Sequence, residues 1–374
     1  MIPINIFTTV LMAGFLHGII LVIALQRVKK ANKRANKFLS LMIGLISLAL
    51  ICRLSYEPQI LQISMKLGML PDFILFLFGP LLLLYIKNLL AKSGELTKIN
   101  WWHFTPAAIH FLYMLGILLM DRERHLEMIL SGQFYLPIHI VLILSLTHNV
   151  IYWFACLKVL NAYQKESKND VSYEPQLKYL YTLLSLTGLC LVVWLISESL
   201  TIGGFGRPDF KTYGYVWISL TFIIYALGFF AMNQPELFKV SLSTEKYQNS
   251  RLSESKIKDE ANRLNDIMLA EQLYKNPKLS RQDLEQETNM NAADLSRVIN
   301  QGFGKNFFDF VNSYRIEEFT RLVHSGEYQN YTLLAIANEA GFNSKTTFNT
   351  AFKKLTGKTP KSFLEETTTK AVAN

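Results

Sequence analysis

Residues 341–360 read GFNSKTTFNTAFKKLTGKTP, and this stretch decides how the C-terminal part of the chain folds. A glycine opens the stretch, apolar residues then recur three and four positions apart, and Gly357 closes it. Apolar residues at this spacing lie on one face of a helix, and glycine commonly ends a helix. The stretch therefore predicts a tight turn, an amphipathic helix and a stop at Gly357.

A near-copy of this pattern lies 53 residues upstream in the chain. Its apolar, glycine and lysine positions correspond to those of the later copy: Leu295 to Phe348, Ile299 to Phe352, Gly304 to Gly357, Lys305 to Lys358 and Phe310 to Phe363. Each copy reads as a helix, a tight turn and a second helix, and two helices joined by a short turn make a helix-turn-helix unit. The C-terminal part is therefore expected to be all-helical, with two such units.

The second helix of each copy divides into two faces at 100° per residue, and Asn291 is expected to cap the first of them. The inward face is apolar and holds Leu295, Val298 and Ile299 in the first copy and Phe348, Ala351, Phe352 and Leu355 in the second. The outward face is mostly polar and holds Ala293, Ser296, Arg297 and Asn300 in the first copy and Thr346, Asn349, Thr350 and Lys353 in the second. Arginine bonds guanine through two hydrogen bonds, asparagine pairs with adenine, and threonine offers a hydroxyl or a methyl group. The outward faces are therefore expected to contact base edges.

Lysines gather around the second copy. Between Lys345 and Lys361 the chain has five lysines and no acidic residue, although residues 251–374 have a net charge of only +1. A basic helix face is more often simply solvated, but the duplicated motif favours a surface that faces phosphate groups. The residues expected to contact phosphate are Lys305, Lys345, Lys354, Lys358 and Lys361.

Together these motifs resemble the DNA-binding domain of the AraC/XylS family of bacterial transcription regulators. The resemblance covers about residues 265–366 and is most specific from Ile336 to Pro360. It implies two recognition helices, joined by a long helix over residues 307–323, that enter successive major-groove faces about 34 Å apart. It also implies regulation of promoters, more often activation than repression, with RNA polymerase as a further partner. Glu285 departs from the family pattern, which has a small residue there, so the first copy is expected to pack less tightly.

The first 232 residues have a different character. The whole chain is 50% hydrophobic and only 18% charged, which is too apolar for a soluble protein of 374 residues. A helix needs roughly 20 apolar residues to cross a membrane. Seven apolar runs approach this length: about 6–25, 38–54, 72–90, 101–120, 134–157, 177–200 and 213–232. The sequence therefore predicts an all-α protein in which a seven-helix transmembrane bundle, residues 1–232, precedes the domain with two helix-turn-helix motifs.

Basic residues indicate the orientation of this bundle. If the N-terminus is outside, the inner loops carry 13 lysines and arginines and the outer loops carry six. Such an excess is typical of the cytoplasmic side. Seven crossings then place the C-terminal domain in the cytoplasm, where the DNA is. We therefore expect a multi-pass protein of the bacterial cytoplasmic (inner) membrane.

Several ionisable residues fall at membrane depth. Asp72, His139 and Glu198 all fall toward the outer leaflet, where they could line a ligand pocket together with Arg207 and Asp209. Ionisable groups in a membrane are costly and often functional, although they also serve as polar contacts between helices. The three cysteines are dispersed, and no residues have the spacing of metal ligands, so neither a metal site nor a cofactor is expected.

A polar stretch, residues 233–256, separates the two halves and is expected to form a linker. The DNA-binding domain then covers 257–366, and a disordered tail covers 367–374. Apolar residues at spacings of four, three and four follow the linker at Ile257, Ala261, Leu264 and Met268. They fit a helix packed on its own domain or a short coiled-coil seam in a homodimer, and we favour the packed helix.

These observations lead to one main hypothesis and two alternatives. The chain is expected to be a membrane-anchored, sequence-specific regulator, not an enzyme, that binds double-stranded promoter DNA and responds to a small-molecule or envelope signal. This arrangement resembles that of membrane-anchored members of the AraC/XylS family. The first alternative is a transporter-like membrane protein with a regulatory DNA-binding tail. The second is an anchored regulator that is released by proteolysis near residues 233–256.

Overall fold

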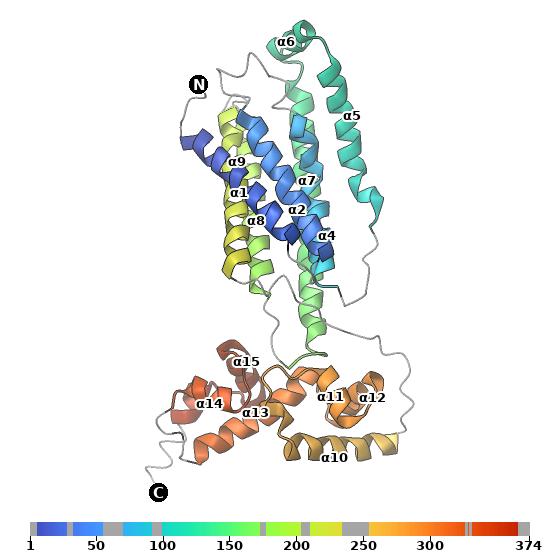
Figure 1. The fold of residues 1–374 in the computed structure, drawn as a ribbon, viewed down its shortest axis with the longest axis vertical. Coiled ribbons are helices and arrows are strands. Elements are labelled where there is room, and N and C mark those ends of the chain that lie inside the picture. The colour runs from blue at the N-terminus through green and yellow to red at the C-terminus, as the bar shows by residue number, and fades with distance from the viewer. Residues whose placement is uncertain are drawn as a thin grey trace. The chain divides into compact units, whose positions relative to one another are not determined.

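The computed structural model describes residues 6–27, 33–54, 70–91, 99–172, 177–202, 210–233, 254–325, 328 and 331–365. The described residues are helical and contain no strand, which confirms the all-α fold class (Figure 1). The chain divides into two compact units, one of residues 1–161 with 176–242 and one of residues 162–175 with 243–374. Residues 234–253 of the expected linker, the expected tail, Arg207 and Asp209 lie outside the described residues.

The first unit is a bundle of apolar helices. Its elements are α1 (Ile6–Arg27), α2 (Lys33–Arg53), η2 (Leu70–Phe76), α4 (Phe78–Leu89), η3 (Trp101–Phe104), α5 (Thr105–Leu119), α6 (Arg122–Leu130), α7 (Tyr135–Ser167), α8 (Lys178–Ile202) and α9 (Phe210–Asn233). Helix α1 packs against α2 and α9, α2 packs against α4, and α8 packs against α9. The indole nitrogen of Trp153 in α7 donates to the carbonyl oxygen of Leu184 in α8 at 2.8 Å, which joins α7 to the same bundle.

Five helices in the described part of the chain are long and apolar enough to cross a membrane. They are Ile6–Gln26, Lys33–Arg53, Trp101–Leu119, Tyr135–Ser167 and Lys178–Ile202. Two further apolar helices, Phe78–Leu89 and Gly214–Leu227, are shorter. Each of the seven apolar runs in the sequence therefore corresponds to helical structure. The run at 72–90 is not one continuous helix, because it divides into the 3-10 helix η2 and the short helix α4.

One side chain of α7 supports this break. The backbone N–H of Gly79 donates to Asn149 Oδ1 at 2.9 Å, and Asn149 Nδ2 donates to the carbonyl oxygen of Leu75 at 2.7 Å. A broken helix in an apolar setting needs such partners, because its freed backbone groups cannot turn to water. Gly79 is also in close contact with α7, since a Cβ at this position would lie 2.7 Å from Cβ of Tyr152. Asn149 therefore has a structural role between helices.

The second unit contains two helix-turn-helix pairs joined by one long helix. Its elements are α10 (Glu254–Ala270), η5 (Leu273–Lys275), α11 (Arg281–Thr288), α12 (Ala292–Arg297), the π-helical turn η6 (Val298–Gly302), α13 (Phe307–His324), α14 (Leu333–Glu339) and α15 (Lys345–Thr356). Helices α11 and α12 form the first pair, and α14 and α15 form the second. The connecting helix α13 matches the expected long helix at 307–323. The two motifs read from the sequence are therefore confirmed as local structure.

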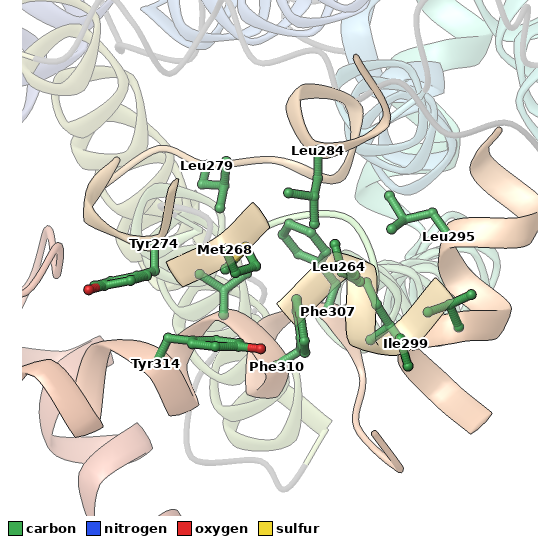
Figure 2. Close-up of a cluster of buried hydrophobic side chains, with 13 residues drawn as sticks. Leu264, Met268, Tyr274, Leu279, Leu284, Leu295, Ile299, Phe307, Phe310 and Tyr314 are labelled. Carbon is green, nitrogen blue, oxygen red and sulfur yellow. The ribbon is translucent and has the colours of Figure 1, made fainter. Parts of the chain in front are cut away.

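Two hydrophobic cores hold this unit together, and α13 contributes to both. Phe310 and Val311 lie in the first core, whereas Phe319 lies in the second. In the first core, shown in Figure 2, Leu264 and Met268 of α10 are fully buried among side chains of α11, α12 and α13. The apolar stripe of α10 thus packs on its own domain, which confirms the favoured interpretation of that helix.

One expectation about the second core is wrong. Leu355 was expected to face inward with Phe348 and Phe352, but 38% of its surface is exposed. The core beneath α15 ends at Phe352, whose ring centroid lies 5.4 Å from that of Phe363. Leu355 lies one turn further along the helix, beyond the side chains that cover this core.

The contact at Gly79 gives a test of the bundle. Gly79→Ala should force α4 away from the stem of Tyr152 and lower the stability of the first unit by about 1–3 kcal/mol, as overpacking of a close contact usually does. Gly116→Ala in α5 is the matched control, because no atom lies within 4 Å of the added methyl group. Thermal unfolding of the full chain in detergent measures both. Equal midpoints for the two variants would contradict the close α4–α7 packing.

Candidate nucleic-acid interface

The outward face of α12 is available on the surface. Asn291 caps the helix by accepting a hydrogen bond from the backbone N–H of Asp294 at 2.9 Å, as expected. Leu295, Val298 and Ile299 are buried in the first core, so the opposite face of the helix points toward solvent. Of the predicted base-facing residues, Asn300 is exposed and three are half-buried, namely Ala293, Ser296 and Arg297.

The outward face of α15 is more open. Ser344 caps the helix by accepting from the backbone N–H of Thr347 at 3.1 Å, and Gly357 ends it with a φ of 74°. Phe348, Ala351 and Phe352 are buried. All four predicted base-facing residues of this helix are exposed: Thr346, Asn349, Thr350 and Lys353. The helix therefore presents one continuous polar face.

A cleft of about 510 Å³ runs beside this face. Asn349, Lys345, Lys353 and Lys361 line it, so residues predicted to contact bases and residues predicted to contact phosphate meet at one place. Its other walls were not found from the sequence: Thr332, Leu333, Leu334, Phe348, Thr359 and Pro360. These residues come from the start of α14, from α15 itself and from the segment after α15, and only the fold brings them to the same cleft.

The lysines of the interface are not equivalent. Lys345, Lys353 and Lys358 are exposed. In contrast, the Nζ of Lys354 bonds to Asp309 of α13, and the Nζ of Lys305 donates to the hydroxyl of Ser313 at 2.9 Å. Lys361 lies 3.8 Å from Glu365 in an exposed ion pair. Lys354 and Lys361 of the run that has no acid in the sequence thus have acidic neighbours in space. Lys305, outside that run, is held by a hydroxyl group, so it and Lys354 are less available for phosphate.

Arg297 also has a partner within its own helix. Its Nε donates to the side-chain oxygen of Gln301 at 3.0 Å, one turn further along. A contact with a guanine requires the guanidinium to exchange this partner for the base. Such exposed hydrogen bonds are weak in net terms, so the exchange is not a large obstacle.

Glu285, which departs from the family pattern, has a specific partner. Its carboxylate accepts from Nε of Arg281 at 2.8 Å, and Nη1 of the same arginine lies 2.8 Å from Asp170 Oδ1. Arg281 is buried, so its charge needs both carboxylates. The first helix pair therefore has a charged cluster where the family pattern has a small side chain.

A fully buried arginine lies between the two helix pairs. Arg315 of α13 is 0% exposed, and its Nε and Nη2 donate to the carbonyl oxygens of Tyr274 and Asn276, each at 2.7 Å. Nη1 donates to the carbonyl oxygen of Ser172 at 3.0 Å, and Nη2 donates to the Ser172 hydroxyl at 3.0 Å. Burial lowers the pKa of Arg315 to about 9, so it is still charged at neutral pH. This role could not be predicted from sequence patterns, because most of the partners of Arg315 lie far away along the chain.

The three ionisable residues predicted to share a pocket, Asp72, His139 and Glu198, fall into two separate pairs. His139 Nδ1 lies 2.6 Å from Glu198 Oε1, and both side chains are buried between α7 and α8. Asp72 pairs instead with Arg53, whose guanidinium lies 4.3 Å from the ring centroid of Trp217. The three residues predicted to share a pocket therefore come together only as His139 with Glu198.

The geometry of the second unit defines a DNA-binding protein with two helix-turn-helix pairs. A protein-family model described as a helix-turn-helix domain, of the AraC type, matches residues 284–366. The match includes both predicted recognition helices and supports a DNA-binding transcription regulator. Neither a curated protein nor a solved structure matches the chain.

The buried arginine gives a test of this unit. Arg315→Met should remove a donor from the acceptors at residues 172, 274 and 276, leave the carbonyl oxygen of Tyr274 without one, and lower the unfolding free energy by about 3 kcal/mol. Hydrogen exchange of the α13 amides in the full chain measures the loss of protection. Arg321→Met is a control on the same helix, because that side chain is 63% exposed and its buried partner Glu318 keeps a second partner, Lys275, at 3.1 Å, so the loss should be smaller. Equal protection in the two variants would contradict the central role of Arg315.

Proposed function

We propose that this protein is a membrane-anchored, sequence-specific transcription regulator, acting as an activator, that controls promoters in response to a signal. The observation that carries the proposal is the pair of recognition helices, α12 and α15. Each presents a polar face outward, and both pack on the same helix, α13. A fixed pair of such helices suits two successive major-groove faces of one operator. We assign no catalytic role to the chain.

The apolar surface of the first unit supports a membrane location. Large apolar side chains are exposed on several of its helices: Leu112 and Leu119 of α5, Leu144 and Ile151 of α7, and Leu189 and Leu195 of α8. Monomeric soluble proteins rarely expose apolar surface on this scale. We propose that residues 1–232 cross the membrane seven times, with α4 and α9 as the two crossings whose described apolar length is short.

The position of residues 162–175 supports the orientation. These residues form the end of α7 and the start of its connection to α8, yet they belong to the same compact unit as the helix-turn-helix pairs. We therefore propose that the α7–α8 connection and the DNA-binding domain lie on the same side of the membrane. Helices α8 and α9 supply the two crossings between them, and the same connection carries the basic residues expected on the cytoplasmic side.

We propose that the interface residues fall into two groups, one that contacts bases and one that contacts phosphate. Arg297, Asn300, Ser296 and Ala293 of α12 face bases, as do Thr346, Asn349, Thr350 and Lys353 of α15. Lys345, Lys358 and Lys361 contact phosphate, Lys361 in exchange for Glu365, and Lys305 and Lys354 do so after releasing Ser313 and Asp309. Double-stranded DNA is the main partner, with the lipid bilayer, RNA polymerase and a second copy of the chain as further partners.

The His139–Glu198 pair is the proposed place where a signal acts. A buried ionisable pair between two membrane helices is expensive, and such pairs are often functional. A small molecule or envelope signal shifts the protein only if it binds one arrangement of the bundle better than another. We propose that this pair changes between such arrangements. Crosslinking in cells, followed by isolation of the protein and sequencing of the bound DNA, tests the function as a whole; recovery of no enriched promoter would reject it.

Base-facing residues should determine sequence preference. Arg297→Ala and Asn349→Ala should each weaken binding to the operator by about 1–3 kcal/mol, while binding to unrelated DNA changes little. Competition binding with base-substituted operators measures the change at each position. If either variant keeps the operator preference of the parent protein, the assignment of the outward faces is wrong.

Phosphate-facing lysines should act on all DNA alike. Lys345→Ala and Lys358→Ala should weaken binding to every sequence and reduce the slope of affinity against salt by about 0.9 each, because one fewer counterion is released. Lys258→Ala on α10 is the control, since this exposed lysine belongs to neither recognition surface. A loss confined to one sequence would argue against a phosphate role.

A further inference from the structure

We propose that residues 167–172, between α7 and α8, are a docking segment that completes the DNA-binding unit and holds it independently of the chain connection at 234–253. The physical attachment stands on contacts within the second unit. Its role in regulation rests on the function proposed above. The segment had no part in the expectations drawn from the sequence, where it was only a basic inner loop.

Backbone pairing fixes the register of this segment. The N–H of Arg281 donates to the carbonyl oxygen of Asp170 at 2.9 Å, and the N–H of Ser172 donates to that of Leu279 at 3.3 Å. Val171 and Ser280 between them form an antiparallel bridge. These bonds depend on position along both chains, so the segment occupies one defined register.

The segment also accepts hydrogen bonds from backbone N–H groups at the starts of two helices. The first N–H groups of a helix have no partner within it. Arg281 begins α11, and its N–H is taken by Asp170. Phe308 is the second residue of α13, and its N–H donates to the carbonyl oxygen of Lys168 at 3.0 Å. The segment therefore caps the first helix of one helix-turn-helix pair and the helix that connects both pairs.

Residues of the docking segment also contact two buried arginines, and part of the segment is itself buried. Asp170 lies against the buried Arg281, and Ser172 offers its carbonyl oxygen and its hydroxyl to the buried Arg315. Asn312 Nδ2 also donates to the carbonyl oxygen of Ser172 at 3.2 Å. Val171 and Ser172 are almost completely buried. Removal of the segment would leave two buried guanidinium groups without part of their acceptors, which is strongly unfavourable.

Two consequences follow for the regulator. The segment is continuous in the chain with α7 and α8, so any movement of those helices acts directly on the start of α11 and on α13. Cleavage within 234–253 alone also leaves the DNA-binding unit bound to the segment. Proteolysis of that connection is therefore insufficient to release the regulator.

The first experiment measures retention after cleavage. A protease site is placed within residues 234–253 of the full chain. The protein is then cleaved in membrane vesicles at high salt, which screens nonspecific electrostatic attraction. The C-terminal fragment is measured in the pellet and in the supernatant. The parent fragment should stay with the membrane, whereas Asp170→Ala with Ser172→Ala should release it at least about tenfold faster, the factor that corresponds to 1.4 kcal/mol. Asn169→Ala, at an exposed neighbour, should behave as the parent does. Equally fast release of the parent and the double variant would overturn the proposal.

A second experiment detects docking by a disulfide bond and leaves the docking contacts of Asp170 and Ser172 in place. Val171→Cys with Ser280→Cys should form a disulfide on oxidation, because facing residues of this kind of bridge have Cα atoms about 4.5 Å apart. Residues 251–374 contain no native cysteine, so a bond that joins the cleaved fragments must use the new one at position 280. Val171→Cys with Lys258→Cys is the control and should not join the fragments. Absence of the 171–280 bond would overturn the docked arrangement.

The third measurement links docking to DNA. Uncleaved parent, Asn169→Ala and the double variant are compared for operator binding in the same vesicles, and the double variant should bind at least about tenfold more weakly. Equal operator affinity would overturn the regulatory role. If the parent binds no DNA while retention and the disulfide are as expected, the proposed function fails and the docking segment stands.

Discussion

The guanidinium of Arg315 is the interaction on which the DNA-binding unit depends. It is fully buried in the helix that joins the two helix-turn-helix pairs, and its donors reach residues 172, 274 and 276. A buried charge is tolerable only when its hydrogen bonds are made, so these chain segments have to stay in place together. Phe342 of the second pair also lies near the same group, 5.8 Å from ring centroid to guanidinium carbon. One side chain thus joins the segments at 172 and 274–276 to the helix on which both recognition helices pack.

The same logic, a polar side chain that satisfies distant backbone groups, operates in the first unit. Asn149 supplies both a donor and an acceptor at the break between η2 and α4, and close packing at Gly79 keeps the two helices in contact. In each unit, the local sequence favours helices, and a few polar side chains determine how those helices are arranged. Each of these side chains contributes strongly to stability, because an unpaired polar group in either interior is costly.

Features that depend on short-range periodicity could be predicted from the sequence. The two helix-turn-helix pairs, the Asn291 cap, the buried faces of α12 and α15 and the packing of α10 all follow from residues within about two turns of each other. Arg315, Asn149 and the docking segment could not be found in this way, because their partners are between about 40 and 140 residues away. Leu355 shows a smaller limit: periodicity gives the face of a residue but not where the core beneath it ends. The partners of Glu285 could not be found either, because the charged cluster around Arg281 includes Asp170, which lies more than 100 residues away in the chain.

Helix α7 continues without interruption for 33 residues and ends at the docking segment. At 1.5 Å per residue it is about 50 Å long, whereas the hydrocarbon core is about 30 Å thick. In the membrane arrangement proposed above, a substantial part of this helix extends into water as a stiff rod. A rod transmits torque and axial displacement that a flexible linker would absorb. A signal passed through such a rod would arrive on the timescale of helix motion, microseconds to milliseconds, and would not wait for the diffusion of a released fragment.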